Sequence, residues 1–166
     1  MLAAQKHKIE QLIDQLLAEA NIETTFPLPL EKIAKHVGFR CHFYIPDEDI
    51  ADIVGTLSHA KQKFYINQNN TRLEQSIAIA RLIGHAVLYG AAQDYICCSY
   101  PSSNSSIPKE RELDYFALAL LLPKALFEQK WHETRRDFSM LAQFFAVNRL
   151  MISARADNLK LQSIAI

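Results

Sequence analysis

Glycine is scarce in this chain, and the scarcity excludes one common kind of site. Only four glycines occur among 166 residues, so no glycine-rich loop of the kind that binds phosphate is present. The three cysteines are odd in number and include no Cys-x-x-Cys pair; they are Cys41, Cys97 and Cys98. We therefore expect free thiols in a reducing compartment rather than a disulfide framework.

The chain also lacks an excess of charge and a long apolar run. Eighteen basic and eighteen acidic residues give a formal net charge of zero, which argues against a general attraction to nucleic acid or to an anionic membrane. No apolar stretch reaches the ~18 residues that a membrane span needs. Residues 1–19 carry charges throughout, without the apolar core of a signal peptide. We expect a cytoplasmic protein with no membrane partner.

The chain does contain well-spaced apolar residues, and these predict its secondary structure. Helical spacing predicts helices at 5–20, 29–37, 71–89, 108 to before Pro123, 124–130, 136–145 and 148–158. Short stretches rich in β-branched and aromatic residues predict three strands, at 39–45, 53–59 and 63–67. The polar segment 99–106 is predicted to be a connector. Strands clustered between helices indicate an α+β fold with a small, mainly antiparallel sheet.

The segment Ser76–Tyr89 looks like an altered metal-binding helix. In the H-E-x-x-H motif, two histidines hold zinc and the glutamate acts as a base. Arg81, Leu82 and His85 stand at these three positions, so only the last ligand remains. A guanidinium stays protonated and cannot be a ligand, and leucine has no proton chemistry. Because they are four residues apart, Arg81 and His85 share one face of the helix.

A second motif gives the altered helix a family resemblance. Residues 110–123 read Glu-Arg-Glu-Leu-Asp-Tyr-Phe-Ala-Leu-Ala-Leu-Leu-Leu-Pro. This segment resembles E-R-E-A-N-x-F-A-x-x-L-L-M-P of the ImmA/IrrE-like metallopeptidases, and Ala80–Tyr89 resembles their A-H-E-L-G-H-x-x-L-H motif. The resemblance implies a zincin-like domain and places Glu112, the second glutamate of the segment, at the position of the third metal ligand.

The resemblance also suggests how the chain is organised. It implies a zincin-like ImmA/IrrE-type domain over residues 1–130, with residues 131–166 forming a C-terminal helical segment packed on it. Gly84, inside the altered helix, costs about 1 kcal/mol relative to alanine, so we expect another element to pack closely over it. The pocket beside this helix is expected to contain Arg81, His85, Tyr89, Glu112 and Asp114.

The altered positions predict a site without zinc chemistry. We expect Arg81 to replace the metal charge by forming a two-point salt bridge with Glu112, with His85 bonded alongside. No catalytic residue, no bound metal and no other cofactor is then expected. The sequence favours a catalytically impaired homologue that binds a protein, and the resemblance implies a helix-turn-helix repressor of a bacterium, phage or mobile element.

Two alternatives stay open. One is an active zinc metallo-endopeptidase that cleaves a repressor through a shifted metal site, made of His85, Glu112 and a further ligand such as His59 or Asp114. The other is a DNA-binding module, because the helices at 136–145 and 148–158 faintly resemble a helix-turn-helix. Four arginines lie near them: Arg135, Arg136, Arg149 and Arg155. Direct nucleic-acid binding is disfavoured by the absence of glycine in the turn and by the neutral overall charge.

Overall fold

The computed structural model of the protein describes residues 1–166 except 23–24, 91, 99–105 and 163–166. The predicted connector at 99–106 lies almost entirely outside the described residues. The elements are α1 Ala3–Ala20, α2 Leu30–His36, β1 Arg40–Tyr44, the short 3-10 helix η1 Glu48–Ile50, β2 Gly55–Ser58, β3 Lys63–Asn67, α3 Arg72–Tyr89, β4 Tyr95–Cys97, α4 Pro108–Leu121, α5 Lys124–Glu133, α6 Phe138–Phe145 and α7 Arg149–Asn158. Every predicted helix and strand is present, with ends within three residues of the prediction.

The sheet confirms the α+β class but has four strands, where three were predicted. Its order is β1-β3-β2-β4, with β1 parallel to β3 and β2 antiparallel to both of its neighbours. The additional strand, β4, is only three residues long and pairs Tyr95 with Leu57 of β2. Because its pairing partner lies far away in the sequence, the local sequence signal for this strand is weak.

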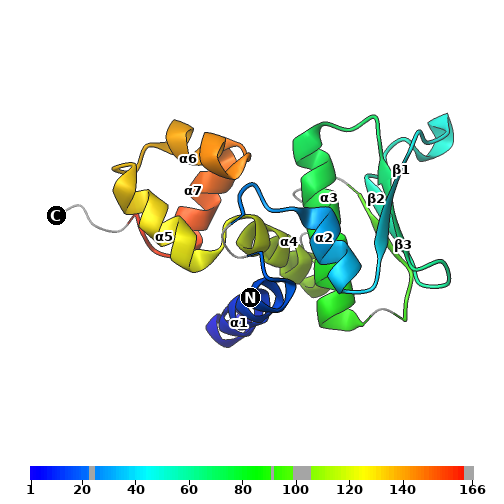
Figure 1. The fold of residues 1–166 in the computed structure, drawn as a ribbon, viewed down its shortest axis with the longest axis horizontal. Coiled ribbons are helices and arrows are strands. Elements are labelled where there is room, and N and C mark those ends of the chain that lie inside the picture. The colour runs from blue at the N-terminus through cyan, green and yellow to red at the C-terminus, as the bar shows by residue number, and fades with distance from the viewer. Residues whose placement is uncertain (23–24, 91, 99–105, 163–166) are drawn as a thin grey trace.

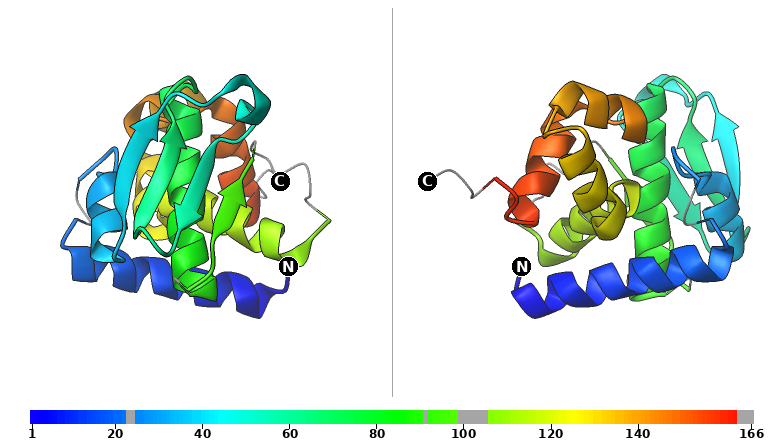
Figure 2. Two further views of the ribbon diagram at one scale, coloured as in Figure 1. Left: turned by 90° about the vertical axis from the view of Figure 1, so that its right-hand side faces the viewer. Right: turned by 60° about the vertical axis from the view of Figure 1, so that its left-hand side comes forward.

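The molecule is layered, with helices on one face of the sheet (Figure 1). α2 and α3 lie against the sheet, α4 packs on α3, and α5–α7 form the layer farthest from the strands. α1 runs along one end of these layers, where it contacts α2 and α4 (Figure 2). Leu57, Phe64 and Ile66 point from the sheet into the core and are fully buried. The Phe39 ring stacks on Phe64 with centroids 4.6 Å apart.

α3 is the central helix, and its first turn is fixed by its own sequence. Thr71 caps the helix by accepting a hydrogen bond from the Glu74 backbone N–H, and the Glu74 carboxylate accepts one from the Thr71 backbone N–H. Such a reciprocal pair satisfies two donors that the helix itself leaves open. All residues from Ile77 to His85 are buried, so the altered motif lies inside the protein. Gly84 faces the ring of Phe116 on α4, which confirms the predicted close packing.

The C-terminal helices enclose an aromatic cluster, which Phe26 from the connection between α1 and α2 also contacts. The rings of Phe127, Trp131, Phe138 and Phe145 contact one another across α5 and α6. α7 is tied to the rest of the molecule by a buried ion pair between Arg155 and Glu10 of α1. None of the helices within the described residues has the length and apolar character needed to cross a membrane.

Candidate functional site

The candidate site lies on α3, where the motif would place its metal ligands and its base. Arg81 is 1% exposed and His85 is fully buried. Leu82, at the position of the base, is also fully buried. Its Cδ1 lies 3.2 Å from the point that a Cβ on Gly55 of β2 would occupy. Leu82 is therefore part of the hydrophobic core between helix and sheet.

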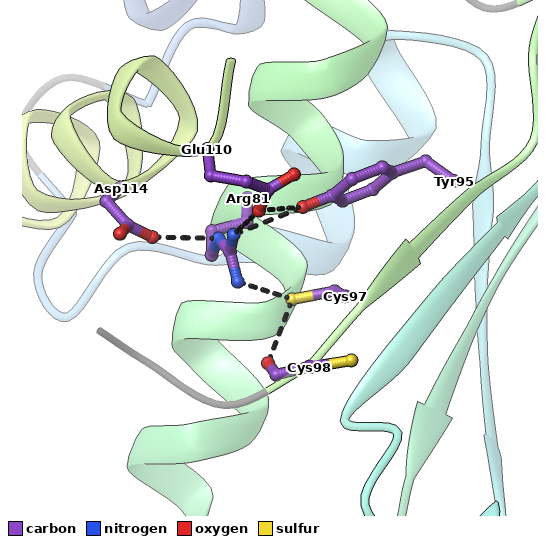
Figure 3. Close-up of polar contacts among 6 residues, drawn as sticks. All are labelled: Arg81, Tyr95, Cys97, Cys98, Glu110 and Asp114. Atoms are coloured by element: carbon purple, nitrogen blue, oxygen red, sulfur yellow. Dashed lines mark hydrogen bonds and ion pairs between the residues drawn. The ribbon is translucent and has the colours of Figure 1, made fainter. Parts of the chain in front are cut away.

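Side chains from β4 and α4 surround the guanidinium of Arg81 (Figure 3). Its Nη1 donates a hydrogen bond to Cys97 Sγ at 3.2 Å, and its Nη2 donates one to the Tyr95 hydroxyl at 3.1 Å. Nη2 also forms an ion pair with Glu110, and Nε lies 3.1 Å from Asp114 Oδ1. The Tyr95 hydroxyl in turn donates to Glu110 Oε2 at 2.9 Å. One buried cation therefore joins α3, β4 and α4.

The groups around Arg81 keep it protonated in spite of its burial. Burial alone would lower the pKa of Arg81, but the surrounding Cys97, Tyr95, Asp114 and Glu110 raise it above its ordinary value. Burial raises the pKa of the Cys97 thiol to about 11 and also raises the pKa of the Tyr95 phenol. Both groups are therefore neutral near pH 7, and the carboxylates of Glu110 and Asp114 supply the negative charge that faces the guanidinium.

Glu112 is not the acidic partner of Arg81, so the predicted salt bridge between them is wrong. The Glu112 carboxylate accepts hydrogen bonds from the Tyr89 hydroxyl and from Nε2 of Gln5, the latter at 3.2 Å. Glu110 and Asp114 are four residues apart and share one face of α4, whereas a residue two positions away points about 200° around the helix. Arg81 thus forms its ion pairs with Glu110 and Asp114, and not with Glu112.

His85 packs among aromatic rings and takes no part in the ion pairs. Its ring stacks on Tyr95 with centroids 4.6 Å apart and lies 5.6 Å from the Tyr89 ring. Among the described residues, neither ring nitrogen has a hydrogen-bond partner. Burial, reinforced by the positive charge of Lys109, lowers the pKa of His85 to about 4, so the ring is neutral at pH 7. The Lys109 ammonium lies 4.8 Å from the Tyr89 ring centroid and 5.5 Å from that of Tyr95.

The structure brings together only part of the predicted pocket. Asp114 forms an ion pair with Arg81, and the His85 ring contacts the rings of Tyr95 and Tyr89, whereas Glu112 bonds to Tyr89 and not to Arg81. The sequence analysis missed three residues that contact the guanidinium: Tyr95, Cys97 and Glu110. Glu110 could have been identified from the sequence, because it lies four residues before Asp114. This is the same spacing that places Arg81 and His85 on one face of their helix.

With Arg81 in place, the residues at this site do not fit the zinc ion that the resemblance implies. The group between the carboxylates is a guanidinium, which carries a positive charge and only donates hydrogen bonds. The shifted site does not assemble either. His59 is exposed at the β2–β3 turn, Glu112 bonds to Tyr89, and Asp114 pairs with Arg81. Across the described part of the chain, no three side chains of His, Cys, Asp or Glu converge to hold a metal.

Comparisons with known proteins agree with this architecture. Residues 40–157 match a family model named Peptidase_M78 and described as the IrrE N-terminal-like domain. A transcriptional regulator of Mycobacterium tuberculosis has a similar fold, with a TM-score of 0.65 and 17% sequence identity over 90% of this chain and 46% of that chain. The chain thus spans less than half of that regulator. No curated protein matches the chain. Since the family model covers most of the sequence, including α3, β4 and α4, the chain belongs to the IrrE N-terminal-like domain family.

Proposed function

We propose that the chain is a non-catalytic member of its family that acts as a protein-binding regulator, with a helix-turn-helix repressor as its partner. One observation carries the proposal: the buried Arg81 guanidinium lies between Glu110 and Asp114, where a metal-binding member would need a ligand. In addition, Leu82 lies in the core at the position of the base. Loss of a general base alone lowers a rate by on the order of 10²–10⁴.

The role in regulation is supported by the comparisons. The family match identifies the fold, and the similar solved structure is a transcriptional regulator. The chain spans only 46% of that regulator, so the partner is inferred from the family resemblance of the two motifs. A domain that keeps the fold but has an arginine in place of a metal ligand retains its surface for binding a repressor.

Binding and cleavage can be separated with purified components. The chain is mixed with helix-turn-helix repressors from the same genome, complex formation is measured by light scattering after gel filtration, and cleavage is measured by intact mass. We expect a stable complex, an uncleaved repressor and no effect of EDTA on either result. Cleavage of the repressor that EDTA abolishes would overturn the proposal, as would the absence of a complex with every repressor tested.

A matched pair of variants locates the binding surface. Tyr89 is 37% exposed at the end of α3, beside the candidate site, and Leu150 is 73% exposed on α7. We expect Tyr89→Ala to weaken the complex at least tenfold and Leu150→Ser to leave it unchanged. The opposite result would assign repressor binding to the C-terminal helices and overturn the role of the α3 surface.

DNA binding through α6 and α7 is a second candidate, with mixed support. α6 ends at Phe145, the following residue Ala146 has a left-handed backbone with φ of 55°, and Asn148 caps the start of α7. This connection is compatible with a helix-turn-helix. However, Arg155 is fully buried against Glu10, so it is unavailable to phosphate. The exposed arginines nearby are Arg135, Arg136 and Arg149. Duplex affinity that falls steeply between about 50 and 200 mM salt would support this candidate.

A further inference from the structure

The sheet has a second face, which points away from α2 and α3. Successive side chains of a strand point to opposite faces, and Leu57, Phe64 and Ile66 point into the core. We call the side of the sheet opposite to these three residues the outer face. The left view of Figure 2 looks onto it, with the strands in front of α2 and α3. A sheet face that meets only water ordinarily carries polar side chains, so aromatic rings there need a reason.

Three aromatic rings lie together on the outer face. Tyr65 follows the buried Phe64 on β3, and His42 and Tyr44 come from the neighbouring strand β1. The ring centroids of His42 and Tyr65 are 5.4 Å apart and those of Tyr44 and Tyr65 are 6.2 Å apart, both edge to face. His42 is exposed and the two tyrosines are half-buried. The cluster offers flat apolar surfaces on which a planar group can stack.

Three cationic side chains accompany the rings. Arg40 and Lys63 are paired in register, two residues before the pair of His42 and Tyr65 on the same strands. The Lys61 ammonium lies 5.8 Å from the Tyr65 ring centroid. Among the ion pairs of the described residues, none involves any of these three cations. Rings beside unpaired cations complement a ligand that combines planar groups with negative charges.

The neutral net charge of the chain is compatible with this local attraction. Four of the eighteen acidic residues lie in the segment 47–52, which follows β1 and so lies at the opposite end of the strand from Arg40. Asp94 is closer to the cations, but its carboxylate accepts a hydrogen bond from the backbone N–H of His59 at 2.7 Å. Charges in salt solution act over about 8–10 Å, so the cations beside the rings determine which ligand is attracted there.

We propose that single-stranded RNA binds across the outer face. Its bases stack on the rings of Tyr65 and His42, and its phosphates bind Arg40, Lys61 and Lys63. Known modules bind single-stranded RNA in this manner, with aromatic side chains presented on a four-stranded sheet. Double-stranded RNA does not fit, because its bases are already stacked on one another. The proposal goes beyond the proposed function and does not depend on it.

Two hydroxyl groups favour RNA over DNA. Thr56 and Ser58 of β2 are paired in register with Tyr65 and Lys63 and are partly exposed. They share the outer face with their partners, since Leu57 between them points into the core. A hydroxyl both donates and accepts hydrogen bonds, as does the ribose 2′-hydroxyl that distinguishes RNA from DNA.

Fluorescence anisotropy of labelled oligouridine of about twelve nucleotides, titrated with the purified chain, tests the proposal. We expect Tyr65→Ala to weaken binding at least about fivefold, the lower end of what one stacked base contributes. Tyr65→Phe keeps the ring and should bind like the wild type, which separates stacking from a loss of folding. The deoxyuridine oligomer and an RNA duplex of the same length should both bind more weakly. No binding of oligouridine at about 50 mM salt, or equal affinity for the deoxyuridine oligomer or the duplex, would overturn the proposal.

A pair of charge variants locates the binding surface. Lys63→Gln should reduce the slope of log affinity against log salt concentration by about 0.7, the contribution of one phosphate contact on a single strand. Arg149 is exposed on α7, in the layer farthest from the strands, so Arg149→Gln should leave the slope unchanged. The reverse result would assign binding to the C-terminal helices and overturn the role of the outer face. All these titrations omit a repressor, so failure of the outer face and failure of the proposed function are distinguishable.

Discussion

Gly84→Ala should destabilise the protein, although alanine is the better helix former. A Cβ at Gly84 would lie 2.7 Å from Cδ1 and 2.9 Å from Cγ of Phe116, whereas ordinary contact begins at 3.4 Å. Phe116 is fully buried, so its ring has no solvent-filled space to move into. Overpacking of this kind costs about 1–3 kcal/mol, and the gain in helix propensity is about 1 kcal/mol. The cost of the clash should exceed the gain in helix propensity, so the free energy of unfolding should fall by about 1 kcal/mol.

Urea unfolding, monitored by circular dichroism, measures the change in the free energy of unfolding caused by Gly84→Ala. The sign of this change tests the prediction. A loss of about 1 kcal/mol corresponds to a melting temperature lower by roughly 2–4 °C in a protein of this size. Phe116→Leu provides the control, because a smaller side chain at position 116 should reduce the cost of Gly84→Ala. A Gly84→Ala protein that is as stable as the wild type, or more stable, would refute the close packing of α3 on α4.

Three further predictions concern buried polar groups and the core. The pKa of His85 is lowered to about 4 in the folded protein, so the unfolded chain binds a proton at this residue at a higher pH than the folded protein does. The stability that neutral His85 contributes is therefore complete above about pH 6.5 and falls by up to about 3 kcal/mol as the pH drops to about 4. His85→Phe should flatten this part of a plot of unfolding free energy against pH, and parallel curves for the variant and the wild type would contradict the assignment. Glu10→Gln should cost about 3–5 kcal/mol in urea unfolding, because it leaves Arg155 without its carboxylate; a cost below 1 kcal/mol would show that the pair is not needed. Leu82→Glu should also lower the free energy of unfolding by about 3–5 kcal/mol, whereas Leu82→Met should lower it by less than about 1.5 kcal/mol. Equal losses in the two variants would show that Leu82 is not in an apolar environment.

The sequence predicted the helical part of the fold well, because the signals for helices are local. The apolar spacing and the capping pair of Thr71 and Glu74 define α3, and the presence of Gly84 correctly indicated close packing. β4 was not predicted, since three residues beside a polar segment carry little information. This strand exists because Tyr95 and Cys97 pair with β2, a contact that depends on the rest of the fold.

The same difference between local and long-range signals explains which features of the site the sequence predicted and which it did not. The missing ligand led us to expect Arg81 to pair with an acidic side chain, and in the structure it pairs with two carboxylates. Its acidic partners depended on the rotation of α4 about its axis, which the family motif alone did not fix; the side chains that face Arg81 are Glu110 and Asp114 rather than Glu112. Tyr95 and Cys97 could be added only when β4 was known.

The most direct test of the account is the zinc content of the purified wild-type protein, measured by elemental analysis after expression in zinc-supplemented medium. Since the Arg81 guanidinium fills the place between Glu110 and Asp114, the account predicts zinc far below one ion per chain, with no difference between the wild type and His85→Ala. Near-stoichiometric zinc that is lost in His85→Ala would contradict it, because a metal would then occupy the site in the presence of Arg81.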